Sequence, residues 1–395
     1  FEQIRNAVCY PKLNVKVCAT HAGITVGEDG ATHQSLEDIS CMRTLPNMTV
    51  VVPADERETE AVVEWAASYE GPVYVRLGRA GVDDVTAEGY TFVPGKSTTL
   101  VDGSDVTIIY DGAVVIDGTQ IIDIGAYDEL CKTYKEAEVI DAHGGLIMPG
   151  FINAHHHIYS ALARGLSLPG PAPTNFGEIL EGLWFFLDNK LTAPDVKASA
   201  LLTYLGCIEN GVTTIFDHHA SYGETVNSLS IIADVAKQFG VRSCLCYEVS
   251  DRNGVDQMKA AVAENVRFGK EAKKDPSRLA AMMGLHASFT LSPETLDYVK
   301  AQNEDKLGYH VHVAEGPEDV ADSKEKYGMT PVRRLVEAGI LGPKSIAGHC
   351  VHVTDQDVEL LKESQAKVVH NPESNMGNAV GTTDILKLLG AGITV

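Results

Sequence analysis

Short apolar runs alternate with a helical pattern near the start of the chain. Three of the runs suit one buried strand each: residues 15–20, 48–52 and 72–76. Between the last two, Asp55 precedes Glu58 by three positions, as in a capping box. Apolar residues then recur at helical spacing at positions 62, 65, 66 and 69. The pattern predicts an α/β unit with a parallel sheet.

After residue 140 the pattern becomes one repeat of a short apolar run, a polar tip and a helical stretch. Seven runs qualify as strands: residues 146–155, 212–217, 241–247, 279–286, 308–312, 345–349 and 367–370. Helical stretches fill the gaps, for example 228–239 and 355–363. This alternation predicts a parallel sheet that closes into a (β/α)₈ barrel, with the active site at the carboxyl ends of the strands.

A third pattern lies between these two. Residues 111–118 and 120–125 form two short apolar runs around an Asp-Gly turn, which predicts a hairpin. The sequence pattern changes at residue 110, and no linker rich in proline, serine or charged residues separates the two parts. Natural domain boundaries usually fall in exposed flexible segments. A join within an expected strand therefore indicates a fusion of two partial proteins.

Composition narrows the choice of partners. The 395 residues carry a net charge of −22, which argues against nucleic acid or an anionic membrane surface as the main partner. No apolar run approaches the length of a membrane span. Eight cysteines are scattered without a disulfide framework, which suits a reducing cytoplasm. The chain begins with Phe1, so we expect it to start inside a longer reading frame.

Histidines stand at or near the ends of most of the expected strands. Side chains alternate along a strand, so His155 and His157 can face one metal ion while His156 points away. His312 is followed three residues later by Glu315, a carboxylate that could act as general base to a water activated by the metal. His218 and His219 follow the second strand and suit either a substrate contact or a structural role at the barrel rim.

The first part of the chain resembles a known family. The stretch "THAGITVGEDGATHQSLEDISCMRTLPNMTVVVPAD" is similar to the pyrimidine-binding domain of transketolases, over residues 1–109. The resemblance implies that contacts to a sugar phosphate come from His21, Asp29, His33 and Arg76. It does not imply bound thiamine diphosphate, because the family's catalytic glutamate and its diphosphate-binding domain lie outside this piece.

The remainder resembles the amidohydrolase superfamily. The stretches "MPGFINAHHHIYSALARG", "GLHASFTLSP", "HVHVAE", "IAGHCVH" and "VVHNPESNMGNAVG" are similar to the cytosine-, guanine- and chlorotriazine-type aminohydrolases. "DRNG" and "ENVRF" bring it nearest to the SsnA-type aminohydrolases. The resemblance implies a partial N-terminal β-sandwich at 110–145 and a hydrolase barrel at 146–395.

The same resemblance implies roles for single residues. His155, His157 and His312 would ligate one divalent metal ion, for which Zn²⁺ and Fe²⁺ both remain candidates. Glu315 and His349 would be catalytic. Four residues would lie along a small-molecule substrate: His286, His370, Ser374 and Asn375. The reaction would be hydrolysis of a carbon–nitrogen bond, as in the deamination of a purine-like ring.

The family pattern also ends its eighth strand in a metal-ligating aspartate. This chain ends at Val395, as that strand begins, so we expect seven strands plus a stub and impaired activity. Two alternatives stay open: a transketolase-type module that uses thiamine diphosphate, and a non-functional chimera of two gene fragments. The sequence leaves the substrate and the oligomeric state undetermined, although related enzymes commonly pair as homodimers.

Overall fold

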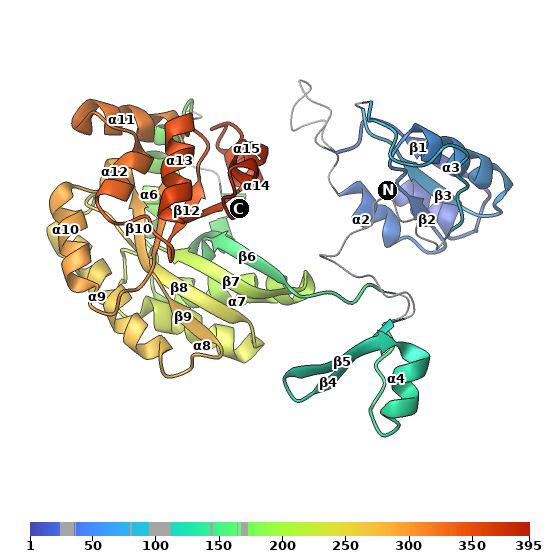
Figure 1. Ribbon diagram of the computed structural model, residues 1–395, viewed down its shortest axis with the longest axis horizontal. Coiled ribbons are helices and arrows are strands. Elements are labelled where there is room, and N and C mark those ends of the chain that lie inside the picture. Colours follow the sequence, from blue (N-terminus) through green and yellow to red (C-terminus); the bar gives the residue numbers. More distant parts are fainter. Residues whose placement is uncertain are drawn as a thin grey trace. The chain divides into compact units, whose positions relative to one another are not determined.

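The computed structural model describes residues 1–23, 35, 37–79, 81–94, 112–142, 145–163, 165–166 and 173–395. The chain divides into two compact units, Phe1–Gly145 and Leu146–Val395, and each is described by itself (Figure 1). The expected boundary between residues 109 and 110 lies outside the described residues. The three-part division of the chain therefore stays a prediction.

The first unit contains the predicted parallel sheet. Its three strands pair in the order β1-β3-β2: β1 Lys16–Ala19, β3 Val73–Arg76 and β2 Thr49–Val51. Both pairings are parallel, which confirms the predicted sheet. The helices of this part are α1 Glu2–Ile4, the π-helix η1 Arg5–Cys9, α2 Asp38–Arg43 and α3 Glu56–Ser68. Val62 and Ala66 of α3 pack against Val73 and Val75 of β3. The apolar faces of the helix and the strand therefore form one small core.

Asp55 holds the start of α3. Its Oδ1 accepts a hydrogen bond from the backbone N–H of Glu58 at 2.8 Å, as the capping pattern predicts. Its Oδ2 accepts from the N–H groups of Val85 and Thr86 at 2.8 and 2.7 Å. One buried carboxylate therefore ties the helix to a segment that is distant in sequence.

The predicted hairpin is also present. Strands β4 Gly112–Asp117 and β5 Gln120–Ala126 pair antiparallel, and helix α4 Tyr127–Thr133 follows directly. Leu130 of α4 is the buried apolar residue of this short element. Because one face of a two-stranded hairpin has little to pack against, Ile116 and Ile121 remain more than half exposed, at 65% and 63%.

The second unit is a nearly closed parallel barrel of seven strands, as predicted. In spatial order these are β13 Lys367–Val369, β12 Ile346–His349, β11 Tyr309–Val313, β10 Met283–Ala287, β8 Arg242–Val249, β7 Val212–His219 and β6 Phe151–His156. A short strand, β9 Leu279–Ala281, pairs with β8 beside this path. After β13, the N–H of Val368 donates to the carbonyl of Thr394 at 2.9 Å, so the last residues align beside β13.

Helices lie on the outside of the strands (Figure 1). Those between or after the barrel strands are α7 Ala193–Glu209, α8 Ser228–Phe239, α9 Val255–Ala272, α10 Pro293–Gln302, α11 Pro317–Tyr327, α12 Pro331–Glu337, α13 Asp355–Ser364, α14 Pro372–Gly377 and α15 Ile385–Gly390. Four shorter elements follow β6: η3 Ile158–Ala163, α5 Phe176–Ile179, η4 Leu180–Trp184 and α6 Phe185–Asp188. The 3-10 turn η5 Ser288–Thr290 follows β10.

Alternation along the strands divides the barrel into two cores. Odd-numbered positions such as Leu245 and Val311 pack with the helices in the large core. Even-numbered positions such as Cys244 and Cys246 form a small apolar cluster with Met282. Because residues two apart share a face, the histidines at even positions of β7 and β11 point the same way as this cluster.

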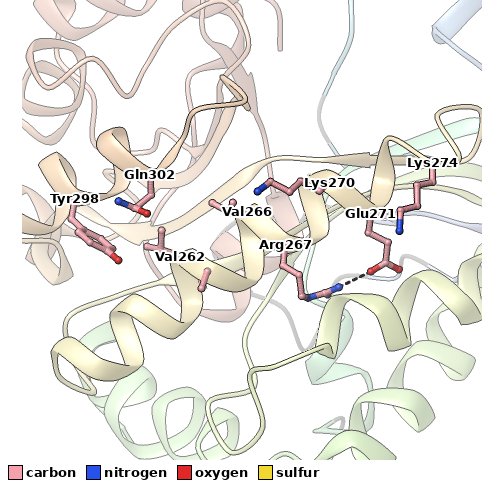
Figure 2. Close-up of a pocket in the computed structure, with 9 residues that line it drawn as sticks. Val262, Val266, Arg267, Lys270, Glu271, Lys274, Tyr298 and Gln302 are labelled. Carbon is pink, nitrogen blue, oxygen red and sulfur yellow. Dashed lines mark hydrogen bonds and ion pairs between the residues drawn. The ribbon is translucent and has the colours of Figure 1, made fainter.

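Two cavities border the barrel. One, of about 860 Å³, runs beside β6, β12 and β13 and reaches His155 and His370. The other, of about 490 Å³, lies between α9 and α10, where Arg267 and Glu271 form an ion pair (Figure 2). The second cavity is lined by none of the barrel histidines. No helix in the described ranges is long and apolar enough to cross a membrane.

Asp319 of α11 ties together two loops at the carboxyl end of the barrel. Its Oδ1 accepts from the N–H of Phe289 at 3.1 Å, and its Oδ2 accepts from the N–H of Ala314 at 2.9 Å. Asp319 is only 3% exposed. Ala314 has a positive φ of 49°, which a residue with a side chain rarely adopts without support. Asp319 supplies that support directly after β11.

Replacing Asp55 by alanine should destabilise the first unit. Burial raises the pKa of Asp55, but hydrogen bonds from Glu58, Thr86 and Val85 outweigh it and hold that pKa well below the ordinary 3.8. A lowered folded-state pKa means that the carboxylate contributes stability above pH 3.8, and that this contribution is lost as the pH falls through the folded value. Hydrogen exchange of the α3 peptides should therefore accelerate in Asp55→Ala near neutral pH, with a smaller difference from wild type in acid. Asp84→Ala, at a carboxylate whose side chain is 34% exposed, is the control. Equal exchange in both variants would contradict the capping role of Asp55.

Asp319→Asn should destabilise the barrel by about 1–3 kcal/mol, because the amide keeps one acceptor and turns a donor toward a backbone N–H. Urea unfolding of the whole chain measures this difference. Asp297→Asn, at a carboxylate whose side chain is 77% exposed on α10, is the matched control and should stay within about 0.5 kcal/mol of wild type. A similar effect of both substitutions would mean that Asp319 does not support the rim.

Candidate metal and catalytic site

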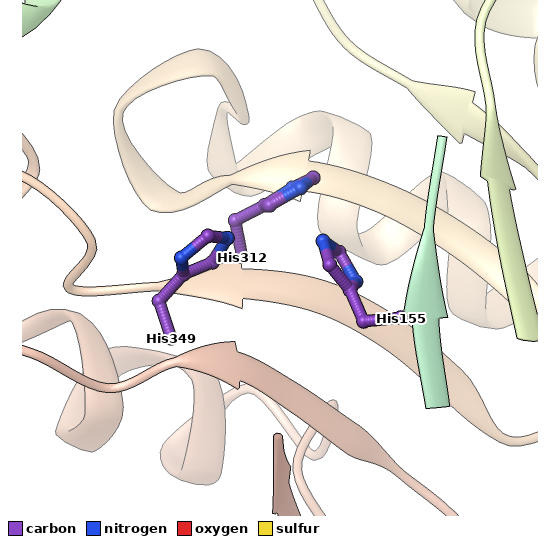
Figure 3. Close-up of side chains that lie close together, drawn as sticks. All are labelled: His155, His312 and His349. Carbon is purple, nitrogen blue, oxygen red and sulfur yellow. The ribbon is translucent and has the colours of Figure 1, made fainter. Parts of the chain in front are cut away.

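Histidines from several strands meet at the carboxyl end of the barrel. His155 lies on β6 and His312 on β11, while His349 ends β12 (Figure 3). His157 directly follows β6, so it shares the face of His155, as the alternation predicts. His156 points elsewhere, and its Nδ1 lies 3.9 Å from the carboxylate of Asp217.

The three proposed metal ligands lie close together. The ring centroid of His155 is 4.8 Å from that of His157 and 4.9 Å from that of His312. The rings of His157 and His312 are stacked, with centroids 5.1 Å apart. Ligand atoms come within 4.8 Å of one another in two groups that share His312: His155, His312 and His349, and His157, His218 and His312.

Backbone carbonyls fix the tautomers of two of these rings. Nδ1 of His157 lies 2.7 Å from the carbonyl oxygen of His218, and Nδ1 of His312 lies 2.9 Å from that of His286. A carbonyl oxygen can only accept, so each Nδ1 carries the proton and each Nε2 is a bare lone pair. These two Nε2 atoms are 3.1 Å apart. Two lone pairs at that distance repel each other unless a cation lies between them.

His155 has a similar arrangement. Its Nδ1 lies 2.7 Å from Nε2 of His310, a partner that orients the ring. Its Nε2 is buried and has no hydrogen-bond partner among the described residues. Metal-binding histidines usually hold their second nitrogen in such a bond. The imidazoles therefore fit a divalent cation, and nitrogen donors of this kind suit zinc or iron.

Burial keeps these histidines neutral, which is the form that binds a metal. Burial lowers the pKa of His157 to about 3, with a further contribution from His218. It also lowers the pKa of His155 and of His312 well below the ordinary 6.5, and the neighbouring histidines add to the shift.

Glu315 and His349 form a pair beside the cluster. Nε2 of His349 lies 3.4 Å from Oε2 of Glu315, while its Nδ1 lies 2.8 Å from the amide oxygen of Asn375. Asn378 donates to Oε1 of Glu315 at 3.2 Å. Burial raises the pKa of Glu315, and His349 and Asn378 partly offset this effect. A carboxylate with a raised pKa is a better proton acceptor near neutral pH.

The expected substrate residues have different surroundings. His286 is buried, its Nδ1 lies 2.8 Å from Oγ1 of Thr290, and its ring contacts Phe185 and Phe289 with centroids 5.5 Å away in both cases. His370 is partly exposed, and its Nδ1 is buried without a partner among the described residues.

The other two expected substrate residues lie on α14. Ser374 is exposed, whereas Asn375 is buried with its amide oxygen bonded to His349. Asn375 is therefore a residue that positions His349, and its substrate contact stays a prediction.

Two features escaped the sequence analysis. The sequence pattern assigns His310 no role, whereas in the structure its Nε2 lies 2.7 Å from Nδ1 of His155. Arg252 is bonded to Asp188 and to Glu248, and its guanidinium lies 4.1 Å from the ring centre of Phe185. The His310-Val-His312 alternation could have indicated the first feature. No local pattern marks the second, because its residues come from α6, from β8 and from the turn after β8.

The expected sugar-phosphate residues belong to the first unit. Nε of Arg76 donates to Asp38 at 2.8 Å, so this guanidinium already has a carboxylate partner. His21 is exposed, and its Nδ1 lies 2.9 Å from Oγ1 of Thr20. Asp29 and His33 lie outside the described residues. The proposed sugar-phosphate contacts therefore stay predictions.

Curated relatives match about three quarters of the chain. The 5-methylthioadenosine/S-adenosylhomocysteine deaminase of Caldanaerobacter subterraneus subsp. tengcongensis is 33% identical over 306 residues, which cover 76% of this chain and 66% of that protein. The 5'-deoxyadenosine deaminase of Methanosarcina mazei is 34% identical over 294 residues, which cover 74% of this chain and 64% of that protein. The chain thus spans slightly under two thirds of the length of these relatives.

Solved structures share the fold. A guanine deaminase from C. acetobutylicum with bound guanine gives a TM-score of 0.65 at 20% identity, over 75% of this chain and 71% of that one. An adenosine deaminase from Xanthomonas campestris with bound zinc gives a TM-score of 0.60 at 22% identity. The match covers 73% of this chain and 64% of that one.

Family models account for both ends of the chain. Residues 1–83 match the pyrimidine-binding domain of transketolase, which agrees with the resemblance of the first unit. Residues 146–395, more than half of the chain, match the amidohydrolase family. On the strength of this match and of the deaminase relatives, the chain belongs to the amidohydrolase family.

Proposed function

We propose that the barrel is a metal-dependent aminohydrolase that removes an amino group from a purine-like ring by hydrolysis. The observation that carries the proposal is the pair of bare Nε2 atoms of His157 and His312, 3.1 Å apart, in a site that also holds Glu315. A cation bound by both Nε2 atoms would remove the repulsion between their lone pairs. Glu315 could accept a proton from an attacking water, which favours hydrolysis as the reaction.

His155, His157 and His312 would hold the ion through their Nε2 atoms. When bound, a divalent cation would lower the pKa of a water molecule in the site to about 7. Zinc is the first ion to test, because a structure with the same fold was solved with bound zinc, and iron is the alternative. The neutral state of the buried imidazoles supports this ligand set.

Glu315 would move the proton. It takes a proton from the attacking water as the new carbon–oxygen bond forms, and gives it to the ring nitrogen beside the attacked carbon. The remaining hydroxyl proton then passes to the departing amino group as the carbon–nitrogen bond breaks. Ammonia leaves, and the ring keeps a carbonyl where the amino group was. His349 faces Glu315 through Nε2 and is held by Asn375, so it would orient the water or stabilise charge on the attacked carbon's oxygen.

Aromatic rings around His286 support a flat substrate. Phe185 and Phe289 both lie against that imidazole, and aromatic faces favour stacking with planar heterocycles. The curated relatives named above act on adenosine derivatives, so adenosine-type compounds are the first substrates to test. The partner is then a small molecule rather than a nucleic acid.

We also propose a cytoplasmic location. All eight cysteines are described and none forms a disulfide, in keeping with a reducing compartment.

Glu315→Gln should lower kcat by roughly 10²–10⁴-fold, because the amide cannot accept the proton, while the bound metal is kept. The test measures ammonia release from 5'-deoxyadenosine, methylthioadenosine, S-adenosylhomocysteine and guanine, together with metal content by mass spectrometry. Glu325→Gln, at an exposed carboxylate of helix α11, which begins two residues after Glu315, should leave both readouts unchanged. An undiminished kcat in Glu315→Gln would contradict the proton-transfer role. Metal-loaded wild-type protein that binds none of these compounds would contradict the proposed substrate class.

A further inference from the structure

Two adjacent histidines, His218 and His219, end strand β7, and the proposed reaction uses neither of them. Both are fully buried, with no exposed surface. Alternation places them on opposite faces of the strand. Nε2 of His219 lies 2.9 Å from Oγ of Ser221, while the His218 ring lies among the histidines of the metal cluster.

The tautomer of His218 follows from its contact with β10. Its Nε2 lies 2.9 Å from the carbonyl oxygen of Leu285. That oxygen can only accept, so Nε2 carries the proton and Nδ1 is a bare lone pair. Nδ1 is buried and has no hydrogen-bond partner among the described residues. Glu248 offers the nearest carboxylate, but its Oε2 is 3.9 Å away, too far for a hydrogen bond.

The ring that carries this bare nitrogen lies beside two rings of the cluster. The His218 ring centroid is 4.6 Å from that of His312 and 5.6 Å from that of His157. Ligand atoms of these three histidines lie within 4.8 Å of one another. A buried nitrogen without a hydrogen-bond partner costs free energy, and a cation bound to it removes that cost.

We propose that Nδ1 of His218 is a further ligand of the metal ion, an inference that rests on the proposed function for the presence of that ion. His312 has one free lone pair, because its Nδ1 is committed to the carbonyl of His286. The two histidine groups that share His312 therefore serve one ion rather than two. The resulting set has His218 bound through Nδ1 and His155, His157 and His312 bound through Nε2. His349 stays outside it, because its Nε2 faces Glu315 and its Nδ1 bonds to Asn375.

This mixed set gives a specific spectroscopic signature. Nuclear magnetic resonance of histidine-labelled protein loaded with cadmium distinguishes metal-bound Nδ1 from metal-bound Nε2 through their couplings to the metal. Wild-type protein should show one histidine coordinated through Nδ1 and three through Nε2. A buried histidine that merely bonds to Leu285 would show no coupling at Nδ1. This readout requires no substitution, so it does not depend on whether a variant folds.

Substitution gives an independent readout. Glutamine at position 218 keeps an N–H group that can reach Leu285 but removes the imidazole nitrogen. In chelator competition with Co²⁺, His218→Gln should bind at least about 10–100-fold more weakly than wild type, with an altered visible spectrum. His219→Gln, a change of the same kind at the neighbouring buried position, should bind within about threefold of wild type. His157→Gln is the reference for loss of a ligand.

The outcomes separate this inference from the proposed function. Wild-type affinity and an unchanged spectrum in His218→Gln, together with weak binding in His157→Gln, would overturn the role of His218 and leave the proposed function standing. Wild-type protein that binds neither Co²⁺ nor cadmium after demetallation and reloading would overturn both. Equal losses in His218→Gln and His219→Gln, with no Nδ1 coupling in wild type, would assign His218 a structural role and overturn the inference.

Discussion

The site depends on which nitrogen of each histidine carries the proton. The carbonyl oxygens of His218 and His286 accept hydrogen bonds from His157 and His312, and these two bonds leave bare Nε2 atoms 3.1 Å apart. Burial removes water as an alternative partner and depresses the pKa of both rings, so protonation does not relieve the repulsion. Backbone geometry, more than the number of histidines, therefore makes this end of the barrel suitable for a cation.

Strand alternation connects that chemistry to the fold. Phe216 and His218 share one face of β7, and Cys244 and Cys246 share the corresponding face of β8. The apolar cluster thus lies on the same face of the strands as the histidines. Electrostatic interactions are strong in such an apolar environment. The same burial raises the pKa of Glu315, the residue proposed to move the proton.

The loops after β11 and β12 carry backbone strain. Ala314, His349 and Cys350 all have positive φ angles, of 49°, 68° and 50°. Residues with side chains adopt this conformation only when the surroundings hold them there. Asp319 supplies hydrogen bonds to one of these loops, and Asn375 bonds to the His349 side chain in the other. The strain coincides with the two residues proposed to act on the substrate, Glu315 and His349.

The sequence by itself determined the elements. Apolar periodicity placed helix α8 at residues 228–239 and the bounds of the barrel strands within about five residues, because periods of 3.6 and 2.0 are local properties of the chain. The run predicted as one strand at 279–286 is divided into β9 and β10. Alternation also separated His156 from His155 and His157. The position of Glu315 just beyond His312 already indicated a general base, whereas the role of His349 came from the resemblance to the aminohydrolases.

Only the tertiary structure decided the partners. His310 orients His155, Leu285 fixes the tautomer of His218, and Asn375 bonds to His349. Each of these contacts joins residues at least 26 positions apart, with 155 between His155 and His310. The register of neighbouring strands and the turns of the loops bring such residues together. A pattern read along the chain describes one element at a time, so it carries no information about which atoms meet across the barrel.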